Sequence, residues 1–185
     1  MIRLALLLPL FLMACASPEI RVPASVPAPT QSVRIAYPSV EVREVSLPSY
    51  AALEEIFYQD ESGTLTALPD LLWADDPTRA FTLGLTRSLA ALTNANVAPE
   101  PWPFDDFPAA RVDVRVEDLL ALPSGQMRLS GQVFIAPLDG QRRGTSELFD
   151  LTVQMQAPVT SASVAAARSQ LILDLAAFIA ERGLR

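Results

Sequence analysis

The side chains that most often carry enzyme chemistry are nearly absent from this chain. It has no histidine and no lysine, and its single cysteine is Cys15. This composition excludes Ser-His-Asp and Cys-His nucleophilic sites, histidine-based zinc sites, Schiff-base chemistry and the lysine of a P-loop. Pairs of carboxylates are the remaining candidates for catalysis by general acids and bases.

Three pairs of adjacent acidic residues occur in the sequence, at Asp60-Glu61, Asp75-Asp76 and Asp105-Asp106. A catalytic pair needs two carboxylates that converge on one substrate. Each pair here has a simpler explanation, namely a turn, the start of a helix and a proline-rich loop. We therefore expect no catalytic site, no metal site and no cofactor.

Cys15 ends a short apolar segment at the N-terminus. Arg3 precedes an apolar run from Leu4 to Met13, about half of the ~20 residues that a membrane-spanning helix needs. Such a segment is typical of a secretory signal peptide. Leu12 to Cys15 resembles the bacterial lipobox, in which the cysteine becomes the mature N-terminus and carries lipid. The alternative is an incidental cysteine, although a leftover cysteine is unusual in a secreted protein.

The residue after Cys15 is Ala16 and not aspartate. In lipoproteins of this type aspartate at that place often means retention in the inner membrane, so this resemblance favours the outer membrane, with the protein facing the periplasm. The formal net charge is −7, which argues against nucleic acid as a partner, because nucleic-acid binding needs clustered positive charge.

The sequence divides into three parts. Residues 1–14 are the expected signal peptide, residues 15–32 a lipidated tether, and residues 33–185 a single folded domain. The tether is predicted because four prolines stand among small residues, with few large apolar groups: Pro18, Pro23, Pro27 and Pro29. As an extended chain it would hold the domain up to roughly 50 Å from the membrane.

The first half of the domain predicts three strands and a helix. Residues 40–45 alternate between apolar and polar, and residues 54–68 read as a hairpin that turns at Gly63. Asp76 is suited to cap a helix and Pro77 to begin it. The expected buried face of this helix consists of Phe81, Leu85, Leu89 and Leu92, and Asn94 or Asn96 is expected to close the helix.

A proline-rich loop follows, with the sequence APEPWPFDDFPAA, and it carries Trp102, Phe104 and Phe107. One interpretation is that these rings plug the edge of the core. The other is that they form a patch that faces a partner protein.

The second half of the domain predicts an antiparallel meander and a final helix. Three alternating strands are expected between residues 110 and 156, with turns at Pro123-Ser124-Gly125 and Asp139-Gly140. The helix is expected from about Thr160 to Arg182, closed by Gly183. The order β-β-β-α-β-β-β-α predicts an α+β fold, an α/β sandwich in which two helices cover a mainly antiparallel, possibly mixed sheet.

Two short motifs resemble the ABC-type transport auxiliary lipoproteins, the PqiC/YmbA-like family. Pro48-Ser49-Tyr50 matches a turn at a strand end in that family, and Trp73-Ala74-Asp75 matches a motif that leads into a leucine-rich helix. The Leu-Asp-Arg that often follows the tyrosine is replaced here by Ala51-Ala52-Leu53. Pro48, Tyr50 and Trp73 also suit purely structural roles, at a strand end and in the core.

The resemblance implies a non-enzymatic lipoprotein subunit of an envelope transport system. Members of the family accompany a permease and an MCE-type protein that carries lipid across the envelope. Expected partners are therefore the membrane, through the N-terminal lipid, MCE-type and permease proteins, and further copies of this chain. Two other interpretations are open: a periplasmic lipoprotein that binds a ligand or lipid in its own pocket, and a lipoprotein that assists outer-membrane protein assembly.

Overall fold

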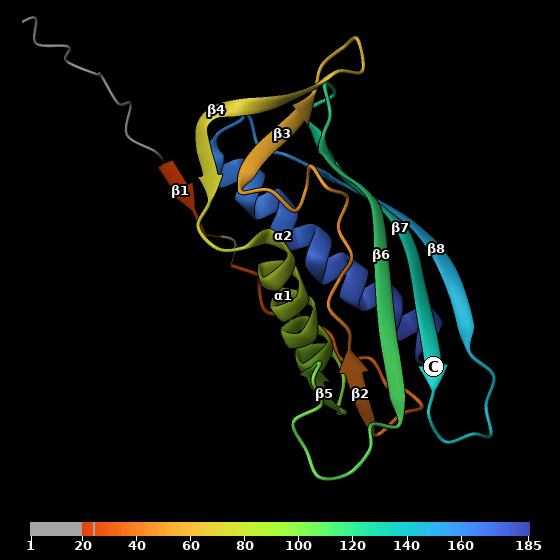
Figure 1. Cartoon of the computed structure of the whole chain (residues 1–185). Coiled ribbons are helices and arrows are strands. Elements are labelled where there is room, and N and C mark those ends of the chain that lie inside the picture. Colours follow the sequence, from red (N-terminus) through yellow and green to blue (C-terminus); the bar gives the residue numbers. More distant parts are fainter. Residues whose placement is uncertain (1–19, 24) are drawn as a thin grey trace, which may run out of the picture.

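The computed structural model describes residues 20–23 and 25–185, and there it shows a curved mixed sheet with two α-helices on one face (Figure 1). The strands are β1 (Ile20–Val22), β2 (Ser39–Val42), β3 (Glu55–Gln59), β4 (Leu65–Trp73), β5 (Asn96–Pro99), β6 (Ala110–Ala121), β7 (Gln126–Pro137) and β8 (Thr145–Gln154). The helices are α1 (Pro77–Leu92) and α2 (Ser161–Phe178), and the π-helical turn η1 (Ile179–Gly183) continues α2.

The sheet combines antiparallel and parallel pairing. β3 pairs antiparallel with β4, and β6, β7 and β8 form an antiparallel meander. β2 lies parallel to both β5 and β6, and β1 lies parallel to β4. The predicted α+β class with a mainly antiparallel, mixed sheet and two helices is confirmed.

The strand order differs from the predicted one, because β1 and β5 are additional strands. β1 has three residues and β5 has four. Strands this short show no alternation that a sequence pattern can detect. They form because a neighbouring strand offers backbone donors and acceptors, β4 in the case of β1 and β2 in the case of β5.

The helix α1 begins as predicted and ends differently. The side chain of Asp76 accepts a hydrogen bond of 2.7 Å from the backbone N–H of Arg79, and Pro77 is the first helical residue. Phe81, Leu85 and Leu89 are fully buried. Thr93, in extended conformation, closes the helix in place of Asn94 or Asn96, because Asn96 already belongs to β5.

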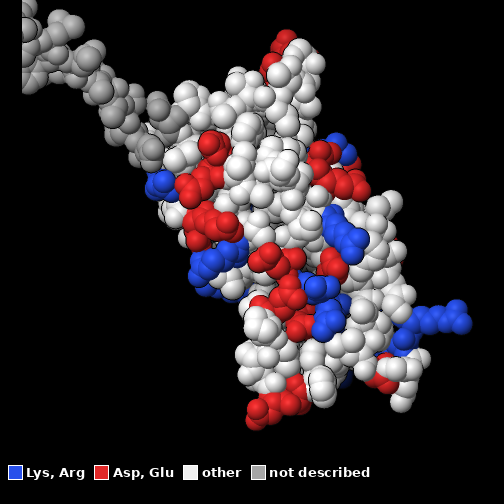
Figure 2. All heavy atoms as spheres, viewed as in Figure 1, with Lys and Arg blue, Asp and Glu red and all other residues white. Residues whose placement is uncertain are grey.

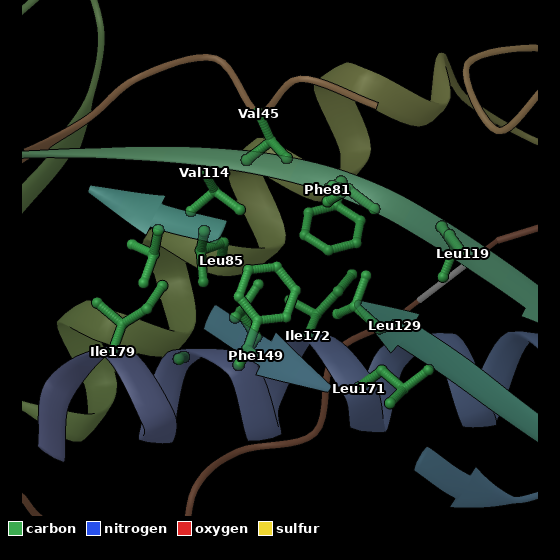
Figure 3. Close-up of a cluster of buried hydrophobic side chains, with 14 of the residues drawn as sticks. Val45, Phe81, Leu85, Val114, Leu119, Leu129, Phe149, Leu171, Ile172 and Ile179 are labelled. Carbon is green, nitrogen blue, oxygen red and sulfur yellow. The ribbon is translucent and has the colours of Figure 1, made fainter. Parts of the chain in front are cut away.

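The core lies between the sheet and the two helices (Figure 3). Val114 and Leu129 from the sheet, Leu85 from α1 and Leu171 from α2 are each fully buried there. The α2 helix starts with a capping box, in which Thr160 and Ser163 each bond the other's backbone N–H. Burial of apolar area at about 25 cal/mol per Å² is the main stabilising contribution to such a core.

The final helix is long and apolar enough to cross a membrane. This holds for Ser161–Gly183, and 61% of its most apolar window is buried inside the fold. Its side chains pack on α1 and on the sheet. That is the behaviour of the core helix of a folded domain, which passes the same test of length and composition.

The N-terminal segment takes a larger part in the fold than a tether would. Ile20–Val22 pairs with β4, and the backbone N–H groups of Val33 and Ala36 donate to the carbonyls of Leu92 and Leu184. Ile20–Val22 therefore belongs to the sheet, although it lies within residues 15–32, for which the sequence predicts an extended tether. The signal peptide, Cys15 and Ala16 lie outside the described residues.

Gly131 lies where any side chain is expected to destabilise the fold. It faces the β-bulge of β6, and a Cβ atom there would lie 2.2 Å from the backbone oxygen of Arg115 and 2.9 Å from Val116 Cα. Because both are backbone atoms, Gly131→Ala is expected to lower the free energy of unfolding by about 3 kcal/mol. Urea unfolding followed by circular dichroism measures this.

Gly140→Ala is the matched control. Gly140 has φ +69° and nothing within 4 Å of an added Cβ, so only backbone strain of about 1 kcal/mol is expected. Equal losses for the two variants would contradict the steric explanation for Gly131.

Candidate functional site

The aromatic loop, residues 100–109, lies between β5 and β6 at one end of the molecule, the lower end in Figure 1. Phe107 is 92% exposed and Phe104 is 51% exposed. Trp102 meets Phe104 edge to face at 5.0 Å between ring centroids, and its Nε1 donates to the backbone oxygen of Asp106 at 2.6 Å. The interpretation of these rings as a plug of the core is wrong for Phe104 and Phe107, because the loop turns them toward solvent.

The base of the aromatic loop is held while its tip is free to make contacts. Glu100 accepts hydrogen bonds from the Arg43 guanidinium at 3.3 Å and from the backbone N–H of Glu44 at 2.8 Å. Asp105 and Asp106 are exposed at the tip. Figure 2 shows acidic side chains at this end of the molecule. The tip therefore presents aromatic rings beside negative charge.

The first family motif shapes a turn and supports the bulge of β6. The carbonyl of Pro48 accepts from the backbone N–H groups of Ala51 and Ala52, which closes the turn. The Tyr50 hydroxyl accepts a 3.1 Å bond from the N–H of Leu119, just after the bulge. Burial raises the pKa of Tyr50. These contacts give Pro48 and Tyr50 structural roles.

The second family motif surrounds a buried arginine. Trp73 ends β4 and is 5% exposed. Its ring lies 4.3 Å from the guanidinium carbon of Arg168, which comes from α2, and the Phe81 ring lies 6.0 Å from the same atom. Asp75 forms an ion pair with Arg79, one turn further along α1. The motif thus joins the end of β4, the start of α1 and the middle of α2.

Arg168 is 1% exposed, and its terminal nitrogen donates to the carbonyl of Pro77 at 2.8 Å. Its Nε atom has no hydrogen-bond partner among the described residues. Burial lowers the pKa of Arg168 to about 10, and the charges of Asp75 and Asp76 act in the opposite direction. The side chain therefore remains a cation at neutral pH.

Arg168 is not among the candidate residues predicted from the sequence. One signal was available: Arg168 follows Val164 by four residues and precedes Leu171 by three, so it occupies a place in the apolar stripe of the helix. A charged residue in such a stripe is unusual, because it must be buried together with its charge.

A cavity of about 360 Å³ adjoins this arginine. It lies between residues 22, 23, 25 and 26 and the outer side of α1, and Trp73, Leu83 and Arg87 are among its lining residues. Val26 packs closely on α1, since a Cβ atom on Gly84 would come within 3.0 Å of Val26 Cγ2. We call it the strap cavity, after the segment that covers it.

The acidic pairs lie apart from one another. Asp60 caps the β3–β4 turn by accepting hydrogen bonds from the Ser62 hydroxyl and from the backbone N–H groups of Thr64 and Ser62, which lower its pKa. Asp75 and Asp76 serve the start of α1, and Asp105-Asp106 belongs to the aromatic loop. Among residues 20–23 and 25–185, no three histidine, cysteine or acidic side chains gather in a way that could hold a metal ion.

Comparison with known proteins decides the family. Residues 22–180 match the ABC-type transport auxiliary lipoprotein component family. The chain belongs to this family. The match includes Pro48, Tyr50, Trp73 and Asp75, the residues on which the resemblance was based. No curated protein matches the chain.

Two solved structures share the fold. One, a crystal structure of an uncharacterized protein, is 19% identical with a TM-score of 0.68 and covers 88% of this chain and 98% of its own. The other, protein XCC0632 from Xanthomonas campestris, is 15% identical with a TM-score of 0.62, and the coverage is 89% of this chain and 93% of that one. At these identities the likeness concerns the fold alone.

Membership of this transport auxiliary family supports the coarser expectations from the sequence. The protein is a lipoprotein of the cell envelope and an auxiliary component of ABC-type transport. Cys15 as the lipid-bearing residue stays a prediction, because it precedes both the matched and the described residues.

Proposed function

We propose that this protein is a non-enzymatic, lipid-anchored subunit of an MCE-type lipid transport system, and that it acts by protein–protein contact. The aromatic loop is the observation that carries the proposal. Phe104 and Phe107 are exposed and Trp102 is partly exposed. Aromatic side chains are enriched in the buried centre of protein interfaces, and tryptophan is frequent among the residues that dominate the binding energy. A permease or an MCE-type protein, as the family resemblance implies, is the partner.

The position of the loop supports this role. The described chain begins at β1 in the upper half of Figure 1, whereas the aromatic loop lies at the lower end. An anchor that precedes β1 therefore leaves the loop accessible. We further propose that the anchor is in the outer membrane, on the basis of Ala16, so that the loop reaches a partner in the periplasm.

Replacing Trp102, Phe104 and Phe107 together with alanine tests the contact. Loss of one such interface anchor costs about 2 kcal/mol or more, equivalent to roughly 30-fold in affinity. We expect the triple variant to lose most of the MCE-type protein that crosslinked pull-down from intact envelopes recovers with the unchanged protein. Because the rings of Phe104 and Phe107 are largely exposed, the variant is expected to stay folded.

Leu148→Ala is the control, because it removes an exposed apolar side chain from a place outside the aromatic loop. Leu148 is an exposed apolar side chain on β8, 72% exposed, and its loss should leave partner recovery unchanged. Unchanged recovery in a folded triple variant would place the interface elsewhere. Absence of any MCE-type partner with the unchanged protein would reject the proposed function.

A further inference from the structure

The strap cavity collects positive charge in an acidic protein. Arg79, Arg87 and Arg168 line it, and Asp75 is the one acidic residue among its described lining residues. The chain as a whole carries a formal charge of −7. The lining of this cavity therefore has a positive charge, whereas the chain as a whole is negative.

Arg168 supplies a buried charge at the floor of this cavity without a hydrogen-bonded carboxylate. Its terminal nitrogen donates to the neutral carbonyl of Pro77, and its Nε atom has no hydrogen-bond partner among the described residues. A buried charge is costly unless it is paired. Asp75, the nearest lining acid, already forms an ion pair with Arg79 and accepts from the N–H of Asp76.

Arg87 stands at the same cavity with its side chain exposed and, among the described residues, without an ion pair. Arg79 and Arg87 are separated along the α1 axis by about 12 Å. Ala80 and Leu83 of α1 and Val26 of the covering segment line the space beside them. The cavity thus combines donors for an anion with an adjoining apolar wall.

We propose that the strap cavity binds a phosphate group, with Arg79 and Arg87 as its direct donors and Arg168 as a fixed positive charge behind them. Arginine presents paired N–H groups that match the oxygens of phosphate. A carboxylate ligand has the same charge as Asp75, so at Arg79 it would only take the place of that residue. A phosphate group has more oxygen atoms and more negative charge, so it can accept hydrogen bonds from Arg79 and Arg87 together. The volume of about 360 Å³ is that of a small-molecule site.

The experiment uses Trp73 as a reporter, because its ring contacts Arg168 beside the cavity. The chain has two tryptophans, so the full chain with Trp102→Phe keeps Trp73 alone, and Cys15→Ser allows purification without detergent. Inorganic phosphate, glycerol 3-phosphate and dihexanoyl phosphatidylglycerol below its micelle concentration are titrated separately at constant ionic strength, with acetate as the carboxylate control. We expect a saturable change in Trp73 fluorescence.

Arg87→Gln is expected to weaken this binding tenfold or more, because one charge-assisted contact is lost. Arg87 is exposed, and circular dichroism verifies that the variant stays folded. Arg143→Gln is the matched control: Arg143 is an exposed arginine in the β7–β8 turn, and binding should not change.

Each outcome of the titrations decides the proposal or its source. Saturation by inorganic phosphate or glycerol 3-phosphate would identify the ligand of the cavity as a soluble phosphate compound. Saturation by phosphatidylglycerol alone assigns a lipid headgroup with its acyl chain on Val26 and Leu83. No saturation with any probe, equal saturation with acetate, or unchanged binding in Arg87→Gln would overturn the proposal. Partner recovery through the aromatic loop is measured separately, so the two proposals fail independently.

Discussion

Replacing Trp73 with alanine is expected to lower the free energy of unfolding by about 3–5 kcal/mol. The side chain is 5% exposed and packs on the guanidinium of Arg168 at 4.3 Å. The alanine variant loses the apolar contacts of the ring, leaves a cavity, and removes a cation–π contact from a buried charge. Because Arg168 remains buried without this contact, we expect a loss in the upper part of this range.

Trp73→Phe separates the two parts of this effect. Phenylalanine keeps an aromatic face toward Arg168 and fills most of the space, so we expect a smaller loss. Trp102→Ala is the control for a tryptophan in a partly exposed place, with a loss of about 1 kcal/mol or less expected. Urea unfolding followed by far-ultraviolet circular dichroism reports all three variants.

A different result would indicate that Trp73 contacts a partner protein rather than stabilising the fold. If Trp73→Ala lost less than about 1 kcal/mol and yet recovered no transport partner, the motif residue would belong to an interface. Its contact with Arg168 and its pairing opposite Val22 of β1 indicate a structural role.

Replacing Cys15 with serine is expected to abolish lipid attachment and to release the protein from the membrane fraction. A thioether to diacylglycerol needs the thiol, and each buried methylene contributes about 0.8 kcal/mol to anchoring. Loss of two or more chains therefore removes nearly all of the affinity for the bilayer. Labelled palmitate should enter the unchanged protein and not the variant, and density fractionation should place the unchanged protein with the outer membrane.

Two controls keep the Cys15 experiment informative. Folding of Cys15→Ser, measured by circular dichroism, distinguishes release from degradation. Equal labelling of the variant and the unchanged protein would reject Cys15 as the lipid site. Labelled protein in the inner-membrane fraction would support Cys15 as the lipid site but reject the outer-membrane proposal.

The sequence by itself determined the elements that depend on local pattern. Alternation predicted the strands β6 and β7, and the alternating residues Val112, Val114, Leu129 and Val133 are fully buried there. Asp76 caps α1 as predicted, because an N-cap bonds backbone groups only two or three residues away. The predicted start of the last helix near Thr160 agrees with α2, which begins at Ser161. The family was also evident from two short motifs, and the matched residues 22–180 confirm it.

Only the tertiary structure decided which side chains meet across long stretches of sequence. The pairing of Ile20–Val22 with β4 depends on a free sheet edge some fifty residues away, about which a proline-rich segment contains no local information. The exposure of Phe104 and Phe107 depends on how the loop base is tied to Arg43 and Glu44. The sequence left both a core position and a surface position open for these rings.

Arg168 is the clearest case of a residue whose contacts depend on the tertiary structure. Helical periodicity places it on the apolar stripe of α2, but its burial beneath Trp73 and its bond to Pro77 require the end of β4, the start of α1 and the middle of α2 to converge. Such contacts are determined by packing between elements, since side-chain periodicity specifies a face and not the partner it meets. The strap cavity and its three arginines therefore became visible only in the folded chain.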